Sequence, residues 1–261
     1  MNNIKLLTEF YDEFYFENKC PYYNSCKKNC NFELNFYRGR VGKDYGKGIP
    51  KILVIGKEPV FPKDYNGEKI TFEVKEPVTM AEAEYNDHYL RTFYTIAKLL
   101  NVNDMPKSYL KNDIGQEKYE YLRHCFAFTN FYKCVFSDSI NHTDKDTSKL
   151  MEKNCTEILI KEIECLKPDI VIFQGKNHET FWEKKTKCEE IEHQDIIVQS
   201  KSRKCNYNQG LYFVKSENHA FYVIDSYHPT SRGIWVNSDV NKYFLRLLER
   251  ARICCEKNSL K

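Results

Sequence analysis

The chain has 261 residues, of which 41% are hydrophobic and 30% are charged, a composition typical of a folded globular protein rather than a disordered one. No apolar run approaches the length that spans a membrane, and the N-terminal residues lack a signal-peptide pattern. We therefore expect a cytoplasmic protein without a membrane partner. The net charge of +3 permits binding to nucleic acid but does not demonstrate it.

The first half of the chain begins with apolar side chains at helical spacing in residues 3–17, which predict a helix. A polar, cysteine-rich segment follows at 20–48. The apolar run 51–55 stops at Gly56 and is typical of a fully buried strand. Helical periodicity returns in residues 80–100.

The second half alternates predicted strands with predicted helices. Strands are expected at 125–129, 169–173 and 221–225, helices at 146–166 and 238–255, and a more irregular segment with one or two strands at 188–217. Strands separated by helices favour a mainly parallel sheet covered on both faces. We therefore predict an α/β fold, a three-layer α/β/α sandwich around a mainly parallel four-stranded sheet. Residues 1–261 are expected to form one domain and a monomer.

Polar side chains follow each predicted strand, at the edge where ligands bind in such sheets. Gly56-Lys57-Glu58-Pro59 follows the first strand, Asn130 the second, Gln174-Gly175 the third, and a segment containing His228 the last. A carboxylate, an amide and an imidazole at one edge suit recognition of a polar heterocycle and hydrolysis of a bond to it. Each also has a purely structural explanation, as a helix cap, a turn residue and a hydrogen-bonded core histidine respectively.

Four segments at these strand ends resemble, in order, the motifs of the uracil-DNA glycosylase superfamily, and most closely its iron–sulfur family. Residues 55–59 (Ile-Gly-Lys-Glu-Pro) are similar to its first motif, and 128–134 (Phe-Thr-Asn-Phe-Tyr-Lys-Cys) to its T-N-x-x-K-C segment. Residues 167–175 match its K-P stretch ending in glycine, and 227–230 (Tyr-His-Pro-Thr) match its Y-H-P motif. The resemblance covers roughly residues 20–250 and implies the uracil-DNA glycosylase-like sandwich.

The resemblance implies a DNA glycosylase that flips a nucleotide out of DNA and hydrolyses its glycosidic bond. Asn130 would read the edge of the base, and Phe72 would stack on it, unless Phe72 is a core residue. His228 would donate a hydrogen bond to the carbonyl oxygen of the departing base. Glu58 would stabilise the cationic sugar and orient water, with Asp64 as the alternative acid.

Further residues of these motifs are assigned to the substrate. Gly56, Lys57 and Pro59 would contact the base, and Ser231 and Arg232 would contact phosphate or enter the minor groove. The first motif departs from the iron–sulfur family, which has its carboxylate at the position of Lys57. The substrate preference within the superfamily is therefore left open.

Eleven cysteines in a chain without a secretion signal argue against a disulfide framework and for metal ligation by some of them. The resemblance implies a [4Fe–4S] cluster on Cys134, Cys155 and two of Cys20, Cys26 and Cys30. Four thiolates also suit tetrahedral zinc, and reduced cysteines without a metal are the third possibility.

Three functions remain open at the level of sequence. The first is a uracil-DNA glycosylase of base-excision repair, acting on single- or double-stranded DNA. The second is a glycosylase for a modified, for example bulky phage-type, pyrimidine in anti-phage defence, suggested by the altered first motif and the segment 188–217. The third is a catalytically inert DNA-binding relative. A ferredoxin-like redox role is the weakest, since it leaves the strand-end residues unexplained.

Overall fold

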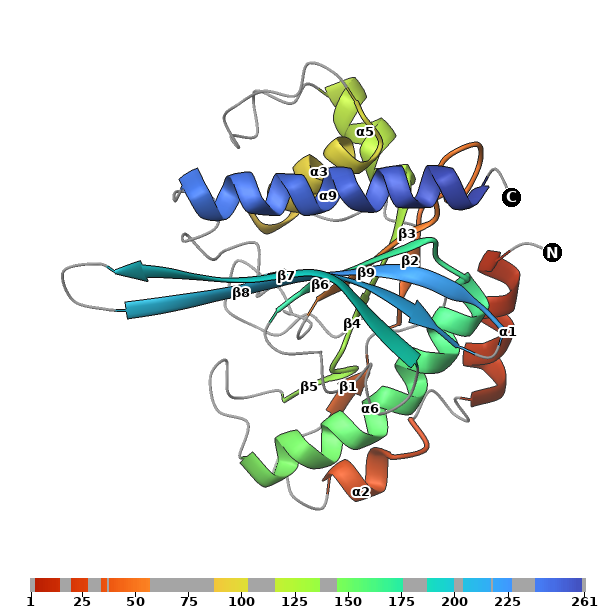
Figure 1. Cartoon of the computed structure of the whole chain (residues 1–261). Coiled ribbons are helices and arrows are strands. Elements are labelled where there is room, and N and C mark those ends of the chain that lie inside the picture. Colours follow the sequence, from red (N-terminus) through yellow and green to blue (C-terminus); the bar gives the residue numbers. More distant parts are fainter. Residues whose placement is uncertain are drawn as a thin grey trace. The chain divides into compact units, whose positions relative to one another are not determined.

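The structure is a computed structural model of the whole chain (Figure 1). It describes residues 3–14, 20–27, 34–36, 38–56, 87–102, 116–136, 145–175, 187–199, 204–216, 218–226 and 238–259.

Helices and strands alternate along the chain, as an α/β fold requires. The helices are α1 (Asn3–Phe14), α2 (Tyr23–Lys27), α3 (Asp87–Leu99), α5 (Gln116–His124), α6 (Lys145–Leu166) and α9 (Ser238–Ser259). The strands are β1 (Leu34–Phe36), β2 (Arg40–Val41), β3 (Ile52–Gly56), β4 (Phe126–Asn130), β5 (Cys134–Phe136), β6 (Ile170–Gln174), β7 (Lys187–Gln199), β8 (Lys204–Lys215) and β9 (Ala220–Ser226). The four predicted strands correspond to β3, β4, β6 and β9, each displaced by no more than one residue.

The main sheet is mixed and has seven strands in the order β2-β4-β3-β6-β9-β8-β7, while β1 and β5 form a separate antiparallel pair. The expectation of a mainly parallel, four-stranded sheet is therefore wrong. β6 and β9 are parallel, but β8 runs antiparallel to both β9 and β7. The segment 188–217, where one or two strands were expected, does form β7 and β8. Their place in the main sheet was not predicted, because β7 carries charged and exposed residues instead of a buried apolar run.

The predicted strands are buried along their whole length in β3, β4 and β6, as their apolar composition requires. β3 and β6 begin side by side, because the backbone amides of Asp169 and Ile170 both donate to the Lys51 carbonyl. The Asp169 carboxylate in turn accepts a hydrogen bond from the Lys51 amide at 2.7 Å. These bonds fix the parallel start of the two strands.

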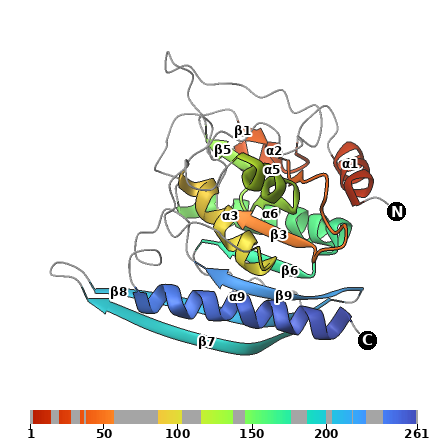
Figure 2. The ribbon, with the colours of Figure 1, turned by 90° about the horizontal axis from the view of Figure 1, so that it is seen from above.

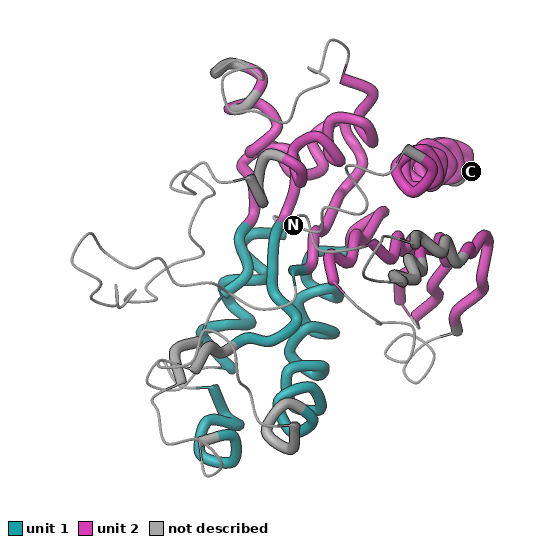
Figure 3. Tube along the Cα trace, turned by 90° about the vertical axis from the view of Figure 1, so that its left-hand side faces the viewer, with its two compact units in different colours: residues 1–40, 56–78, 128–167 teal, residues 41–55, 79–127, 168–261 magenta. Residues whose placement is uncertain are grey.

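The chain divides into two compact units, each assembled from separate stretches of sequence (Figure 3). Unit 1 comprises residues 1–40, 56–78 and 128–167, and unit 2 comprises 41–55, 79–127 and 168–261. In unit 1, α1 packs along α6. The expectation of a single domain stays a prediction.

In unit 2, α9 packs on α3, β8 and β9 (Figure 2). Its apolar side chains recur at intervals of three and four residues and are buried, namely Val240, Phe244, Leu247 and Ala251. Arg246 and Arg250, on the polar side of the same helix, both bond the Glu192 carboxylate of β7. The helix is thus attached to the β7–β8 hairpin by packing and by charge.

Within the described parts of the chain, no helix combines the length and the apolar character needed to cross a membrane.

Candidate functional site

The described residues contain only part of the predicted site. The residues that lie outside them are Cys30, Lys57, Glu58, Pro59, Asp64, Phe72, His228, Ser231 and Arg232. Gly56, Asn130, Cys20, Cys26 and Cys155 are described, and Cys134 is described as a backbone position in β5. The roles assigned to Glu58 and His228 therefore remain predictions.

Gly56 and Asn130, the last residues of β3 and β4, lie against each other in unit 1. A Cβ atom added to Gly56 would stand 2.6 Å from the Asn130 side-chain oxygen and 3.1 Å from the Phe128 ring. The amide of Phe131 also donates to the Gly56 carbonyl at 2.7 Å. Asn130 is only 2% exposed. Glycine is therefore required at the end of β3, because any side chain would displace the asparagine amide.

A row of buried polar residues crosses the ends of β6 and β9 and the middle of β8 in unit 2. Gln174 pairs with Ser226 in the sheet register, and Gln209 comes next because its neighbour Gly210 pairs with Asp225. Gln174 and Thr92 of α3 exchange hydrogen bonds, and the Ser226 hydroxyl donates to the Phe173 carbonyl.

Gln209 differs from the other residues of this row. Its side chain is fully buried, and among the residues that the structure describes neither amide atom has a hydrogen-bond partner. Gln209 was not among the predicted site residues, because one or two strands were expected at 188–217 but their place beside β9 was not. A glutamine followed by glycine in a segment of alternating polar and aromatic residues carries no distinctive signal. Gln209 follows the Gly210–Asp225 pair in the direction of Ser226, the residue that precedes the Tyr227-His228-Pro229 motif.

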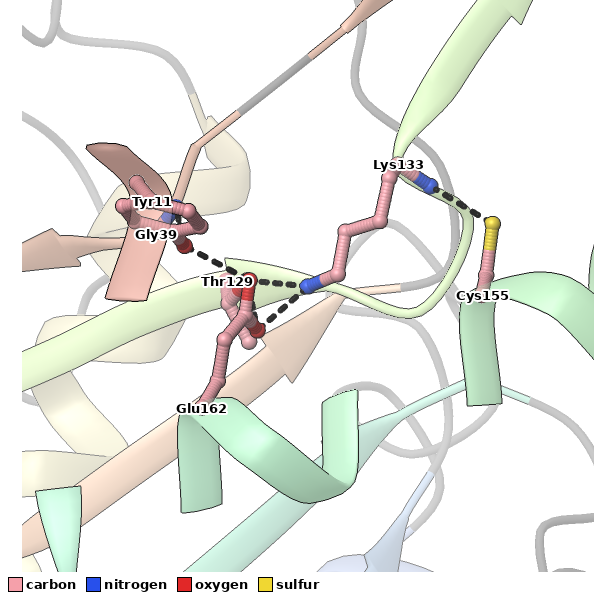
Figure 4. Close-up of polar contacts among 6 residues, drawn as sticks. All are labelled: Tyr11, Gly39, Thr129, Lys133, Cys155 and Glu162. Atoms are coloured by element: carbon pink, nitrogen blue, oxygen red, sulfur yellow. Dashed lines mark hydrogen bonds and ion pairs between the residues drawn. The ribbon is translucent and has the colours of Figure 1, made fainter. Parts of the chain in front are cut away.

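The residue before the predicted metal ligand Cys134 belongs to a buried polar network (Figure 4). The Lys133 ammonium donates to the Glu162 carboxylate at 2.5 Å and to the Thr129 hydroxyl at 2.6 Å. Thr129 donates to the same carboxylate at 2.9 Å. The Lys133, Thr129 and Glu162 side chains have no exposed surface. The buried charges of Lys133 and Glu162 thus compensate each other, and the Thr129 hydroxyl bonds both groups, within the core of unit 1.

Tyr11 extends this network to α1. Its hydroxyl donates to Glu162 at 2.6 Å and accepts from the Gly39 amide at 2.6 Å (Figure 4). Burial, followed by the charge of Glu162, raises the pKa of Tyr11 well above its ordinary value. The network therefore joins α1, the segment before β2, the end of β4 and α6.

Three of the predicted cysteine ligands gather in unit 1. Cys20, Cys26 and Cys155 are all buried, and the charges of Cys20 and Cys26 both act on the Cys155 thiol. The Lys133 amide donates to the Cys155 sulfur at 3.4 Å, and the Asn154 amide to the Cys26 sulfur at 3.3 Å. Burial raises the pKa of Cys155 to about 12 and that of Cys20 to about 11. The Cys155 and Cys20 thiols are therefore protonated at neutral pH unless a metal ion displaces the protons.

Cysteine thiolates are ligands of the type that iron–sulfur clusters and zinc prefer, so the chemistry of these side chains fits a soft metal. Among the described residues, however, no group of three His, Cys, Asp or Glu is arranged to hold a metal ion. Cys30 and the side chain of Cys134, which would complete the set, fall outside this description. Because Cys134 follows Lys133 directly, its backbone lies next to the residue that bonds Cys155.

No protein-family model matches the chain, and a search of curated proteins finds none that matches its sequence.

Proposed function

We propose that the protein is a DNA glycosylase that hydrolyses the bond between a flipped-out uracil, or a related pyrimidine, and its deoxyribose. The fold we propose for it is the three-layer α/β/α sandwich of the uracil-DNA glycosylase superfamily, enlarged by the β7–β8 hairpin. The proposal rests on the resemblance of the four motifs at the strand ends. It also rests on the positions of the strands that carry these motifs.

The observation that carries the proposal is the close approach of Gly56 and Asn130. These residues belong to two motifs separated by more than seventy residues of sequence, and they lie at the ends of neighbouring strands. A nearly buried amide supplies one acceptor and two donors, which suits the edge of a pyrimidine. The glycine lets this amide pack directly against the end of β3.

The chemistry would resemble glycoside hydrolysis, with a transition state in which positive charge develops on the sugar. The bond from the sugar carbon to the base nitrogen breaks, and its electron pair leaves with the base. His228 donates a hydrogen bond to the carbonyl oxygen on which the negative charge collects. Glu58, with Asp64 as the alternative, stabilises the cationic sugar and orients water. Water supplies hydroxide to the sugar carbon and a proton to the base, leaving an abasic site.

A [4Fe–4S] cluster on Cys134, Cys155 and two of the three N-terminal cysteines is part of the proposal, with zinc as the alternative. When bound, it would crosslink α2, β5 and α6 and take no part in bond cleavage. Support comes from the three buried thiols that already lie within electrostatic range of one another.

A panel of DNA substrates tests the proposal directly. Single- and double-stranded oligonucleotides, each with one uracil or one modified pyrimidine, are incubated with the protein and then treated with alkali, which cuts at abasic sites. We expect cleavage at the altered base alone. Cleavage of a modified pyrimidine but not of uracil would favour the anti-phage glycosylase, and cleavage of none would overturn the proposal.

Variants then separate the assigned roles from general damage to the protein. Glu58→Gln and His228→Ala should each lower the rate roughly 10²-fold or more, because each removes charge stabilisation from the transition state. Glu9→Gln removes an exposed carboxylate from α1 and is the matched control. Equal activity in all three variants would show that the roles are wrongly assigned.

A further inference from the structure

Thr129 directly precedes Asn130, the proposed base reader, and is held by the buried network of unit 1. Successive side chains of a strand point to opposite faces of the sheet, so Thr129 and Asn130 point in opposite directions from β4. The Thr129 hydroxyl accepts a hydrogen bond from the Lys133 ammonium and donates one to the Glu162 carboxylate (Figure 4). Fixing the Thr129 side chain on one face therefore fixes the direction of the Asn130 side chain on the other.

The backbone that follows Asn130 is held as well. β4 ends at Asn130, and the Lys133 ammonium bonds back across the following bend to the Thr129 hydroxyl at 2.6 Å. Within the bend, the Phe131 amide donates to the Gly56 carbonyl at 2.7 Å, and the Phe131 side chain is buried. The bend that starts at Asn130 is thus closed by a side chain of the network and attached to β3.

The Asn130 side chain depends on this backbone for its orientation. Among the residues that the structure describes, none forms a hydrogen bond with the Asn130 amide, which packs against the end of β3 at Gly56. The amide can therefore bond a ligand, but no hydrogen bond from a described residue orients it. Its orientation comes from packing and from the restrained backbone on either side.

Stability alone does not explain an ion pair at this place. Replacing a buried ion pair with apolar residues of similar volume is often neutral or stabilising, because both charges lose their hydration on burial. Lys133 and Glu162 have no exposed surface, so this cost applies to both. The pair provides directed hydrogen bonds, which apolar side chains do not, and both of its members bond the same Thr129 hydroxyl. Buried polar groups specify a single conformation in some proteins.

We propose that the Lys133–Glu162 ion pair is a positioning element for base recognition, which sets the orientation of Asn130 through Thr129. Neither side chain of the pair is exposed, so the pair acts through the backbone of β4 and its bend and not by contact with DNA. A misplacement of about 1 Å in a recognition group can lower a rate about 10²-fold. The inference rests on the proposed function for the role of Asn130, but not for the effect of the pair on its position.

The double variant Lys133→Met/Glu162→Leu separates positioning from stability, because it removes both charges and leaves neither unpaired. We expect it to fold but to excise the preferred base at least about tenfold more slowly than the wild type. The rate is measured in a single turnover with a saturating excess of protein, so that it does not depend on the fraction of folded protein. Its affinity for an unmodified duplex should be that of the wild type. A wild-type rate of excision would overturn the proposal.

Thr129→Val is a milder variant, which keeps the ion pair but removes the hydroxyl through which the pair acts. It should also excise the base slowly, and Thr129→Ser, which keeps the hydroxyl, should recover most of the rate. The control is Thr95→Val, which removes a similarly buried hydroxyl that donates to the Arg91 carbonyl within α3. Equal rates for the two variants of Thr129, or an equal loss in Thr95→Val, would leave the network a purely structural role and overturn the proposal.

The position of Asn130 can also be measured without catalysis. Crystal structures of the wild type and of Thr129→Val, prepared in the same way, should differ in the position of the Asn130 amide, while α1 and α6 superpose. An Asn130 amide that stays in place would contradict the positioning role. If the amide moves but the wild type excises no base from DNA, the glycosylase proposal fails and the positioning of Asn130 by the ion pair stands.

Discussion

Lys133 and Glu162 form an ion pair with a nitrogen–oxygen distance of 2.5 Å, and neither side chain has any exposed surface. An isolated charge in this position would be costly, because water is replaced by a medium of low polarity. The pair persists because Thr129 and Tyr11 provide the remaining hydrogen bonds of the carboxylate. Stability of unit 1 should therefore depend on keeping both charges together.

Replacing Glu162 with Gln should destabilise the protein by about 3–5 kcal/mol, because it leaves the Lys133 ammonium buried without its counter-charge. Urea unfolding followed by circular dichroism measures the change. The double variant Lys133→Met/Glu162→Leu should recover much of the loss, since no buried charge remains. The exposed pair Lys161–Glu164 is the control, and Glu164→Gln should change stability by less than about 1 kcal/mol. A similar cost at positions 162 and 164 would show that the buried pair is not a major determinant of stability.

The Tyr11 hydroxyl should contribute measurably to the same network. Tyr11→Phe removes the donor to Glu162 and the acceptor for the Gly39 amide, leaving buried polar groups unsatisfied. We expect a loss of about 1–3 kcal/mol in the free energy of unfolding. Tyr22→Phe, which removes a solvent-exposed hydroxyl bonded to Glu157, should cost less. Identical losses in the two variants would argue that the bridge to Gly39 is unimportant.

The strand that carries Thr129 was predictable from sequence, but the ion pair between Lys133 and Glu162 was not. The apolar run 125–128, which leads to Thr129, predicts a buried strand because few other structures can bury such a run. Glu162 follows Ile158 by four residues and precedes Leu166 by four, so it interrupts the apolar stripe of α6. That interruption signals a buried acid, but only tertiary structure identifies Lys133 as its partner.

For the strands β7 and β8, in contrast, the pairing was not predictable from sequence. Their pairing depends on backbone register and on a long hairpin, whereas side-chain alternation is weak where one strand lies at the sheet edge. The candidate site contains residues that the sequence identified and one that it did not. Gly56 and Asn130 were selected from strand ends and lie together. Gln209 was not selected, because the pairing of its strand with β9 was not predicted.

Gly56→Ala should impair base recognition more than it impairs DNA binding. The new methyl group would displace the Asn130 amide, and a misplacement of about 1 Å in a recognition group can cost about 10²-fold in rate. Single-turnover cleavage of the preferred substrate and duplex affinity are measured side by side. Gly48→Ala is the control, since a Cβ there meets no atom of the described residues within 4 Å, although its positive φ will lower stability. Unchanged cleavage by Gly56→Ala would argue against Asn130 as a base reader.

The cysteine group should bind its metal through Cys155 but not through Cys165. Protein purified without oxygen should contain iron and show the visible absorbance of an iron–sulfur cluster, and Cys155→Ala should lose both. Cys165→Ala, three turns further along α6, should retain them. Zinc in place of iron would identify the alternative metal, and a wild-type protein free of both would exclude a resident metal.

Alkaline pH should weaken folding through thiols that are buried in the protonated form. Burial raises the pKa of Cys125 from 9.0 to about 11, and its thiol donates to the Tyr121 carbonyl at 3.2 Å. The folded protein therefore holds this proton more tightly than the unfolded chain. The resulting stability is complete below pH 9 and is lost as the pH rises toward 11.

Urea midpoints measured across this pH range under reducing conditions should fall less steeply for Cys125→Ala than for the wild type. Leu122→Ala is the control, because it truncates a buried neighbour that does not titrate. It should lower every midpoint, by about 2–5 kcal/mol in stability, without changing the slope against pH. If Cys125→Ala retains the wild-type slope, the proton linked to alkaline unfolding belongs to another group. Cys255 is the next candidate, because burial raises its pKa to about 11 as well.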